Sequence, residues 1–151
     1  MLLLRPIITI PMTLKEIAAV SGKSGLFRVV APARAGLLLE SLDDKKIRSV
    51  VPASAKVSVL EEISIFTTTA EGTEPLADVL KKVHALFSES LPVTPDSEPN
   101  ALRAFMNQVL SEHDAERVYN SDIRKLVRWY EIIKTFAPEI LSAAASGDAA
   151  Q

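Results

Sequence analysis

The chain of 151 residues contains no cysteine, and it contains only two histidines. The absence of cysteine excludes disulfides, thiolate zinc sites, iron–sulfur clusters and cysteine nucleophiles. Aromatic residues make up only 5% of the chain, so the core must consist mainly of leucine, isoleucine, valine and alanine. A concentrated charge of one sign is also missing. Residues 1–72 carry a formal +2, residues 73–151 carry −4, and neither half has the strongly cationic composition that is typical of phosphate binding.

A long apolar run is missing as well. The opening MLLLRPIITIP has eleven residues and is interrupted by Arg5 and Pro6. It fits neither a signal peptide nor a membrane span, which needs roughly 20 apolar residues. We therefore expect residues 1–11 to be an extra strand or an extension upstream of a usual start at Met12. The composition predicts a folded cytoplasmic protein with no membrane partner.

The stretch from residue 21 to residue 69 contains short apolar segments separated by turn residues, which is typical of an antiparallel meander. Thr13 and Glu16 have the spacing of a capping box and predict a short helix that stops at residues 21–22. Strands are expected over 25–30, 37–42, 47–51 and 63–66, with a turn at residues 43–46 and a single helical turn at Glu61-Glu62. We predict a small SH3-like β-barrel or meander.

From residue 75 onward the apolar spacing becomes helical. We expect an amphipathic helix over 75–88, a proline-rich linker over 89–100, a helical domain over 101–137, and a mostly frayed tail over 138–151. Ser121 is a candidate N-cap for the last long helix. The predicted fold class is α+β, with a β-barrel unit at 12–88 and a helical unit. Both units are small, so we expect them to dock on each other or the chain to self-associate.

No set of residues composes a reaction centre. His84 is predicted at the rim of its helix, and His113 at the C-terminal end of another, so neither suggests a metal site. The paired carboxylates at 43–44 and 61–62 are adjacent in sequence, whereas acid–base catalysis needs two carboxyls on opposite sides of a substrate. The segment Ser21-Gly22-Lys23-Ser24-Gly25 lies between a predicted helix and a strand, the reverse of a phosphate loop. We predict no enzyme activity, cofactor or metal.

Two binding surfaces remain as candidates. The first is a protein interface on the last helix, where aromatic residues lie beside an arginine. It consists of Trp129, Ile132, Phe136 and Arg128. This surface predicts an adaptor or scaffold that binds a protein partner or a second copy of the chain. The alternative is a weak nucleic-acid-binding face on the barrel, formed by Arg28, Lys45, Lys46 and Arg48.

Four segments of the sequence are similar to those of a known family. They are MTLKEIAAVSGKSGLFRVV from Met12, GLLLESLDDKK, VSVLEEISIFT and RVYNSDIRKLVRWYEIIK. Together they resemble an uncharacterised bacterial family common in Bacteroidetes, over about residues 12–137. The resemblance implies a two-part cytoplasmic bacterial protein whose members begin at the position of Met12. It implies no activity and no functional residue.

Overall fold

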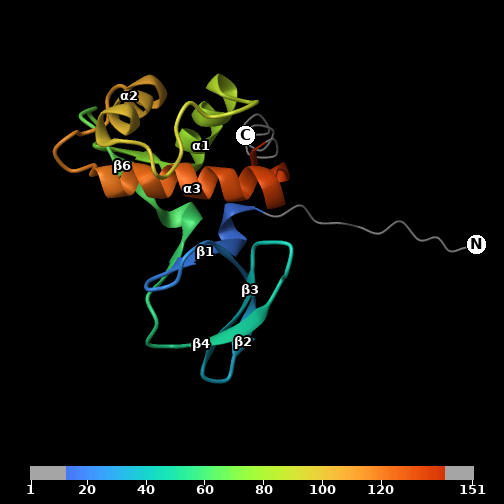
Figure 1. Cartoon of the computed structure of the whole chain (residues 1–151). Coiled ribbons are helices and arrows are strands. Elements are labelled where there is room, and N and C mark those ends of the chain that lie inside the picture. Colours follow the sequence, from blue (N-terminus) through green and yellow to red (C-terminus); the bar gives the residue numbers. More distant parts are fainter. Residues whose placement is uncertain (1–12, 142–151) are drawn as a thin grey trace, which may run out of the picture.

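The computed structural model describes residues 13–141, which form a five-stranded sheet followed by a small hairpin and three helices (Figure 1). The strands of the sheet are β1 (Ile17–Val20), β2 (Phe27–Ala33), β3 (Gly36–Ser41), β4 (Arg48–Pro52) and β5 (Val57–Val59). All pairs are antiparallel, in the order β4-β3-β2-β1-β5. The described residues contain no pairing between β4 and β5, so the sheet is open, and the predicted closed barrel is not confirmed.

The predicted N-terminal helix is wrong beyond its first turn. Thr13 does accept a hydrogen bond from the Lys15 amide at 3.3 Å, but the turn that it caps is a short 3-10 helix, η1 (Leu14–Glu16). Residues 17–20 then form β1, which pairs with β2 on one side and β5 on the other. The hydrogen bonds that β1 forms with both neighbouring strands stabilise it more than local propensity stabilises a helix of four apolar residues. Pairing with distant strands therefore overrides a weak local helix propensity.

The strands predicted at 25–30, 37–42 and 47–51 are confirmed as β2, β3 and β4 with small shifts of their ends, whereas β5 was not predicted. The turn between β3 and β4 depends on Asp43, whose carboxylate accepts hydrogen bonds from the amides of Lys45 and Lys46 and from the hydroxyl of Ser41. These bonds lower the pKa of Asp43, with the bond from Ser41 contributing most. The predicted turn at 43–46 is therefore correct, and its mechanism is local side-chain bonding to backbone amides.

A second, smaller sheet follows the first. The Glu61-Glu62 pair lies in the 3-10 helix η2 (Leu60–Glu62), as expected. The strand β6 (Ser64–Phe66) then pairs with β7 (Thr73–Pro75) and not with the main sheet. β7 leads directly into α1 (Leu76–Leu86), which occupies most of the predicted helix 75–88. The hairpin thus carries the chain from the main sheet to the helices.

Two further helices complete the described chain: α2 (Pro99–Val109) and α3 (Asn120–Phe136). The predicted N-cap of α3 at Ser121 is wrong. Tyr119 holds that position, and its amide donates to the carboxylate of Asp122 at 2.9 Å. The segment 89–100, predicted as a linker, is tied to α3, because Arg124 donates to the carbonyls of Pro95 and Ser97.

One main core joins the sheet to the helices. Leu14, Ile17 and Leu60 from the first part of the chain belong to the same buried cluster as the inner faces of α1, α2 and α3. The sheet's own core is much smaller, with only Val20 and Leu39 buried beside Val51. In Figure 1, α3 runs between the main sheet on one side and α1 and α2 on the other. The expected docking of the two units is confirmed.

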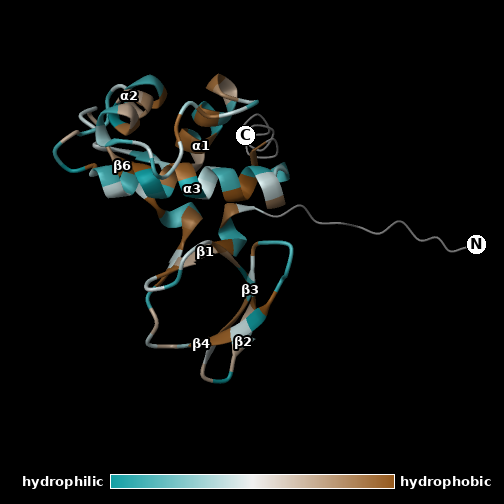
Figure 2. Ribbon diagram, viewed as in Figure 1, coloured by the Kyte–Doolittle hydropathy of each residue, from teal (hydrophilic) through white to brown (hydrophobic). Residues whose placement is uncertain are grey.

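The helix α3 is apolar on more than one face: Ile123, Leu126, Val127, Tyr130 and Ile133 are buried, and Trp129 and Ile132 are partly buried against the same core. Figure 2 shows apolar residues alternating with polar ones along it. After α3, Ile140 and Leu141 are buried, so the first residues of the predicted frayed tail instead belong to the core. The rest of that tail and residues 1–11 lie outside the described residues. Within residues 13–141, no helix combines the length and the apolar character that a membrane span requires.

Candidate ligand-binding cleft

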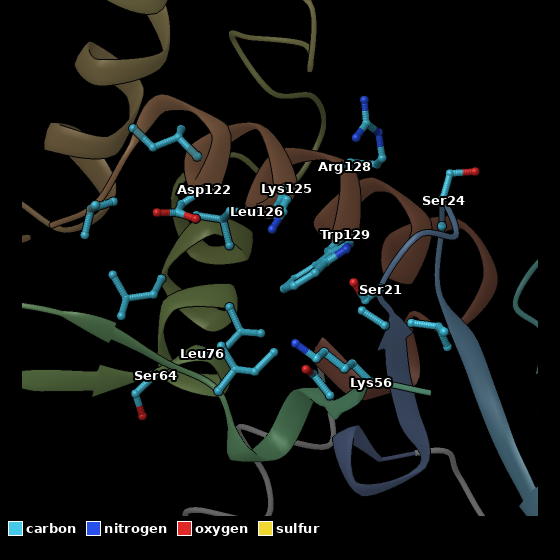
Figure 3. A pocket seen from close by; sticks show the side chains of 18 of the residues that line it. Ser21, Ser24, Lys56, Ser64, Leu76, Asp122, Lys125, Leu126, Arg128 and Trp129 are labelled. Atoms are coloured by element: carbon cyan, nitrogen blue, oxygen red, sulfur yellow. The ribbon is translucent and has the colours of Figure 1, made fainter. Parts of the chain in front are cut away.

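A cleft of about 650 Å³ lies where the main sheet, the β6–β7 hairpin and α3 meet (Figure 3). The turn between β1 and β2 (residues 21–25) and residues 56 and 58 form one wall. Lining residues of α3 form the opposite wall, and β6 with the start of α1 closes the side between them. The volume lies in the range of small-molecule and peptide-anchor sites.

The walls of the cleft are strongly cationic. The described lining contains five cations, Lys23, Lys56, Arg117, Lys125 and Arg128, against one carboxylate, Asp122, which gives a formal charge of +4. Asp122 is engaged in capping α3. Among residues 13–141, four of the five cations form no salt bridge; the exception, Arg117, pairs with Asp114 at 3.0 Å. Unpaired cations around a concave surface raise the local concentration of anions.

Trp129 lies at the centre of the cleft. Figure 3 shows its ring between Lys125, on the same helix, and Lys56, on the facing wall. The side chain is half-buried and packs against the main core. Asp122, Lys125 and Trp129 are spaced by three and four residues, which places them on one face of α3. An aromatic ring beside exposed cations is a typical binding anchor.

The turn between β1 and β2 contains a glycine, Gly22, that has open space around it. The backbone of Gly22 has φ +87°, a left-handed conformation that L side chains rarely adopt, and no atom lies within 4 Å of where a Cβ would be. The Ser21 amide donates to the Lys56 carbonyl at 2.9 Å, which joins the turn to the segment before β5. Lys23 and Lys56, which lie in these two joined segments, both line the cleft.

The end of the cleft near the hairpin holds a second aromatic–cation pair. The guanidinium carbon of Arg117 lies 4.3 Å above the ring centre of Phe66, whose side chain is 43% exposed. Phe66 is therefore a surface residue and not part of the core. β6 leaves the main sheet and pairs only with β7, so Phe66 projects from a two-stranded ribbon.

The four residues of the predicted protein interface separate into two groups. Arg128 and Trp129 line the cleft, and Arg128 is exposed. Ile132 packs against the main core, and Phe136 is 38% exposed at the end of α3, beyond the cleft. Sequence reasoning missed the other cations of the cleft. Lys125 was detectable from its helical spacing to Trp129, whereas Lys23 and Lys56 come from distant segments.

The four residues of the alternative nucleic-acid face lie away from the cleft. Arg28 and Arg48 both pair with Glu40, at 3.8 Å and 3.2 Å, which neutralises part of their charge. Lys45 and Lys46 lie at the exposed turn between β3 and β4. The binding role of this face stays a prediction.

Neither histidine belongs to the cleft. His84 contacts the hydroxyl of Tyr130 at 3.3 Å, and the ring of His113 contacts the carbonyl of Leu110, the C-cap of α2. No group of three or more histidine, aspartate or glutamate side chains within residues 13–141 is arranged to hold a metal ion.

Two family models match the chain, one after the other. Domain of unknown function (DUF5606) matches residues 14–60, and Domain of unknown function (DUF6852) matches residues 63–133. A solution NMR structure of a protein from Bacteroides vulgatus has 31% sequence identity and a TM-score of 0.66, and the match covers 80% of this chain and 85% of that one. This chain belongs to that two-part family of unknown function. No curated protein matches the chain significantly.

The resemblance inferred from the four sequence segments is therefore confirmed. In this two-part family the first matched region ends at Leu60 and the second begins at Ile63, so α1 falls in the second region. The two regions meet at η2, and both contribute residues to the cleft. The candidate site thus needs residues of both matched regions.

Proposed function

We propose that the protein is a non-enzymatic cytoplasmic adaptor that binds a segment of a partner protein in the cleft and along α3 as far as Phe136. The observation that carries this proposal is the half-buried Trp129 ring at the centre of a concave surface, with the exposed Arg128 next to it. Tryptophan and arginine are among the residues that are enriched at the energetic centres of protein interfaces.

The chemistry of the lining supports binding more than catalysis. Among the described lining residues there is no histidine, and the single carboxylate of Asp122 accepts a hydrogen bond from the Tyr119 amide. A general acid or base must be within hydrogen-bond reach of the reacting group and able to exchange a proton with it. Lysines and serines without such a partner are better suited to holding a ligand.

We also infer that the main sheet is an open variant of an SH3-like small barrel. Its first strand lies between the second and the fifth, and the second, third and fourth strands follow in order. Fold alone does not determine function. What matters for the cleft is the geometry of this sheet, because its β1–β2 turn forms one wall.

The test of the adaptor function is affinity purification from the native host, comparing the wild-type chain with Arg128→Glu and Trp129→Ala. Arg128→Glu changes an exposed side chain and should leave the fold intact. Arg34→Glu, an equal charge change at an exposed position outside the cleft, is the matched control. The proposal predicts partners that are retained by the wild type and by Arg34→Glu but lost from both cleft variants. An unchanged set of partners would disprove it.

A second copy of the chain is the other protein that could bind this surface. Light scattering of the same variants distinguishes this case, because self-association through the cleft would give a larger mass for the wild type than for Arg128→Glu. A constant monomer mass would leave a different protein as the partner.

The second candidate function is nucleic-acid binding by the alternative face, supported by the adjacent exposed cations Lys45 and Lys46. Filter binding of single-stranded DNA and RNA at low salt tests it, because contacts to phosphates strengthen as salt is lowered. Retention that is lost in Lys45→Glu/Lys46→Glu would support this face. No retention at low salt would exclude it.

A further inference from the structure

We propose that the segment held in the cleft is an extended acidic peptide, in which carboxylates flank one apolar or aromatic side chain. This inference rests on the proposed adaptor function and specifies the chemistry of its partner. The carboxylates would contact the cations of the two walls, and the apolar side chain would contact the floor beside Trp129.

The distribution of charge supports an anionic segment. The whole chain has a formal charge of −2, whereas the cleft lining has +4, so the residues outside the cleft carry −6. The cations occur on both walls, with Lys23 and Lys56 on the sheet side and Lys125 on the helix side. An acidic segment is therefore attracted to the cleft, whereas the other residues of the chain together carry negative charge.

The same distribution favours a short peptide segment over a nucleic-acid strand. A strand longer than the cleft would extend beyond its cations, and the residues outside the cleft carry a formal charge of −6 in total. A peptide can carry its carboxylates only where the cations are. Single-strand binding proteins instead combine a long cationic groove with several stacking aromatics, and the described lining offers two aromatic rings, one of which already stacks with Arg117.

The floor of the cleft supports an apolar anchor on the ligand. Ala19, Ile63 and Ile65 are partly buried apolar residues that line the cleft together with Trp129. A simple anion would leave this apolar surface exposed to water, whereas one leucine or phenylalanine side chain would cover it. Charged walls over an apolar floor therefore match a peptide that carries both kinds of group.

Trp129 is the only tryptophan of the chain, so the tryptophan fluorescence of the protein reports on the cleft alone. The experiment titrates the full-length protein with three probes that lack tryptophan, and it follows the fluorescence of Trp129. The probes are a short glutamate-rich peptide around a single phenylalanine, the same peptide with glutamine in place of glutamate, and an oligothymidylate. The variants Lys56→Glu and Lys125→Glu are compared with Lys15→Glu, an exposed lysine outside the cleft.

The proposal predicts a saturable change with the acidic peptide, weaker binding as salt is raised, and no change with the glutamine peptide. Each cleft variant should weaken binding by about fivefold or more, and Lys15→Glu should bind like the wild type. A folded protein whose Trp129 emission does not respond to the acidic peptide overturns the proposal. Tighter binding of the oligothymidylate than of the acidic peptide also overturns it.

The two experiments give different results if the acidic-peptide inference is wrong and if the adaptor function is wrong. If a partner is lost in Arg128→Glu during affinity purification but the acidic peptide does not bind, the adaptor function stands and the peptide chemistry is wrong. If the acidic peptide binds but no partner depends on the cleft, the cleft takes an acidic ligand that is not part of a stable protein partner, and the adaptor function is wrong.

Discussion

Arg103 of α2 and His113 of the α2–α3 connection meet inside the protein, with Nη1 of Arg103 3.1 Å from Nε2 of the imidazole. A guanidinium can only donate, so Nε2 accepts and the hydrogen of the ring lies on Nδ1, which donates to the Leu110 carbonyl at 2.8 Å. Arg103 also donates to the carbonyl of Val118 and to the side chain of Asn120. These contacts hold the α2–α3 connection, and therefore the start of α3, in place.

Replacing Arg103 by alanine should destabilise the fold, because it leaves the imidazole of His113 and the Val118 carbonyl without their donor. A buried polar group that loses its partner costs about 1–3 kcal/mol of unfolding free energy. Urea denaturation measures this loss. Arg128→Ala is the matched control: it removes an exposed arginine and should change the stability by less than about 0.5 kcal/mol. Equal stability of the two variants would show that the Arg103 network contributes nothing.

The ion pair of Asp114 and Arg117 should make the stability depend on pH in the acidic range. The hydrogen bond from Arg117, followed by that from the Glu116 amide, lowers the pKa of the Asp114 carboxyl below its ordinary value of 3.8. A lowered pKa in the folded state stabilises the protein above the unfolded pKa, and this contribution is lost as the pH falls through the folded value. Asp114→Asn should remove that part of the acid dependence in urea midpoints measured against pH. An identical acid profile for the variant contradicts the prediction.

The elements predicted correctly from the sequence are those stabilised by residues that are close to one another in the chain. The apolar residues of α1 repeat at helical spacing on one helix face, and the Asp43 turn is held by bonds within four residues of the chain. β1 was predicted as a helix because residues 17–20 follow a good N-cap. Their two partner strands lie further along the chain, at residues 27–33 and 57–59. Such pairing is non-local and leaves no periodic signal in a four-residue segment.

The cleft was only half predictable for the same reason. Trp129 and Arg128 were identifiable from α3 alone, because residue type and helical spacing are local properties. Lys23 and Lys56 are distant in sequence, and their segments meet through the pairing of β1 with β5 and the hydrogen bond from the Ser21 amide to the Lys56 carbonyl. The basic face predicted from the sequence has less free positive charge than expected, because Arg28 and Arg48 both pair with Glu40. This pairing depends on the register of β2, β3 and β4, which the sequence alone does not reveal.

The buried Tyr130 should make the stability fall at high pH. Tyr130 is 1% exposed, and burial raises the pKa of its hydroxyl above the ordinary value of 10.0. A raised folded-state pKa gives a contribution that is complete below the unfolded pKa and is lost as the pH rises through the folded value. Tyr130→Phe should abolish this alkaline loss.

At neutral pH the same variant should cost about 1 kcal/mol, because the contact with His84 Nδ1 at 3.3 Å disappears. Thermal unfolding at neutral and alkaline pH measures both effects. Tyr119→Phe, at an exposed tyrosine, is the matched control and should leave the alkaline profile unchanged. A control that altered this profile as much as Tyr130→Phe would mean that the hydroxyl of Tyr130 is not its source.

Gly36 should be the glycine that is least tolerant of a side chain. It is the first residue of β3, and a Cβ at this position would overlap the carbonyl oxygen of Val51 in β4. The obstacle is backbone, so no side-chain rotation relieves it, and β3 and β4 would have to separate. Gly36→Ala should therefore lower the unfolding free energy by about 1–3 kcal/mol.

Gly22→Asn is the matched comparison for Gly36→Ala. The space around Gly22 is open, and asparagine enters the left-handed region more readily than most residues. Its cost should therefore be smaller, and denaturant midpoints of the two variants measure the difference. If Gly36→Ala proved as stable as the wild type, β3 and β4 could not lie as close as described. The smaller loss expected for Gly22→Asn separates the two requirements for glycine: close approach of the backbone at Gly36 and backbone conformation at Gly22.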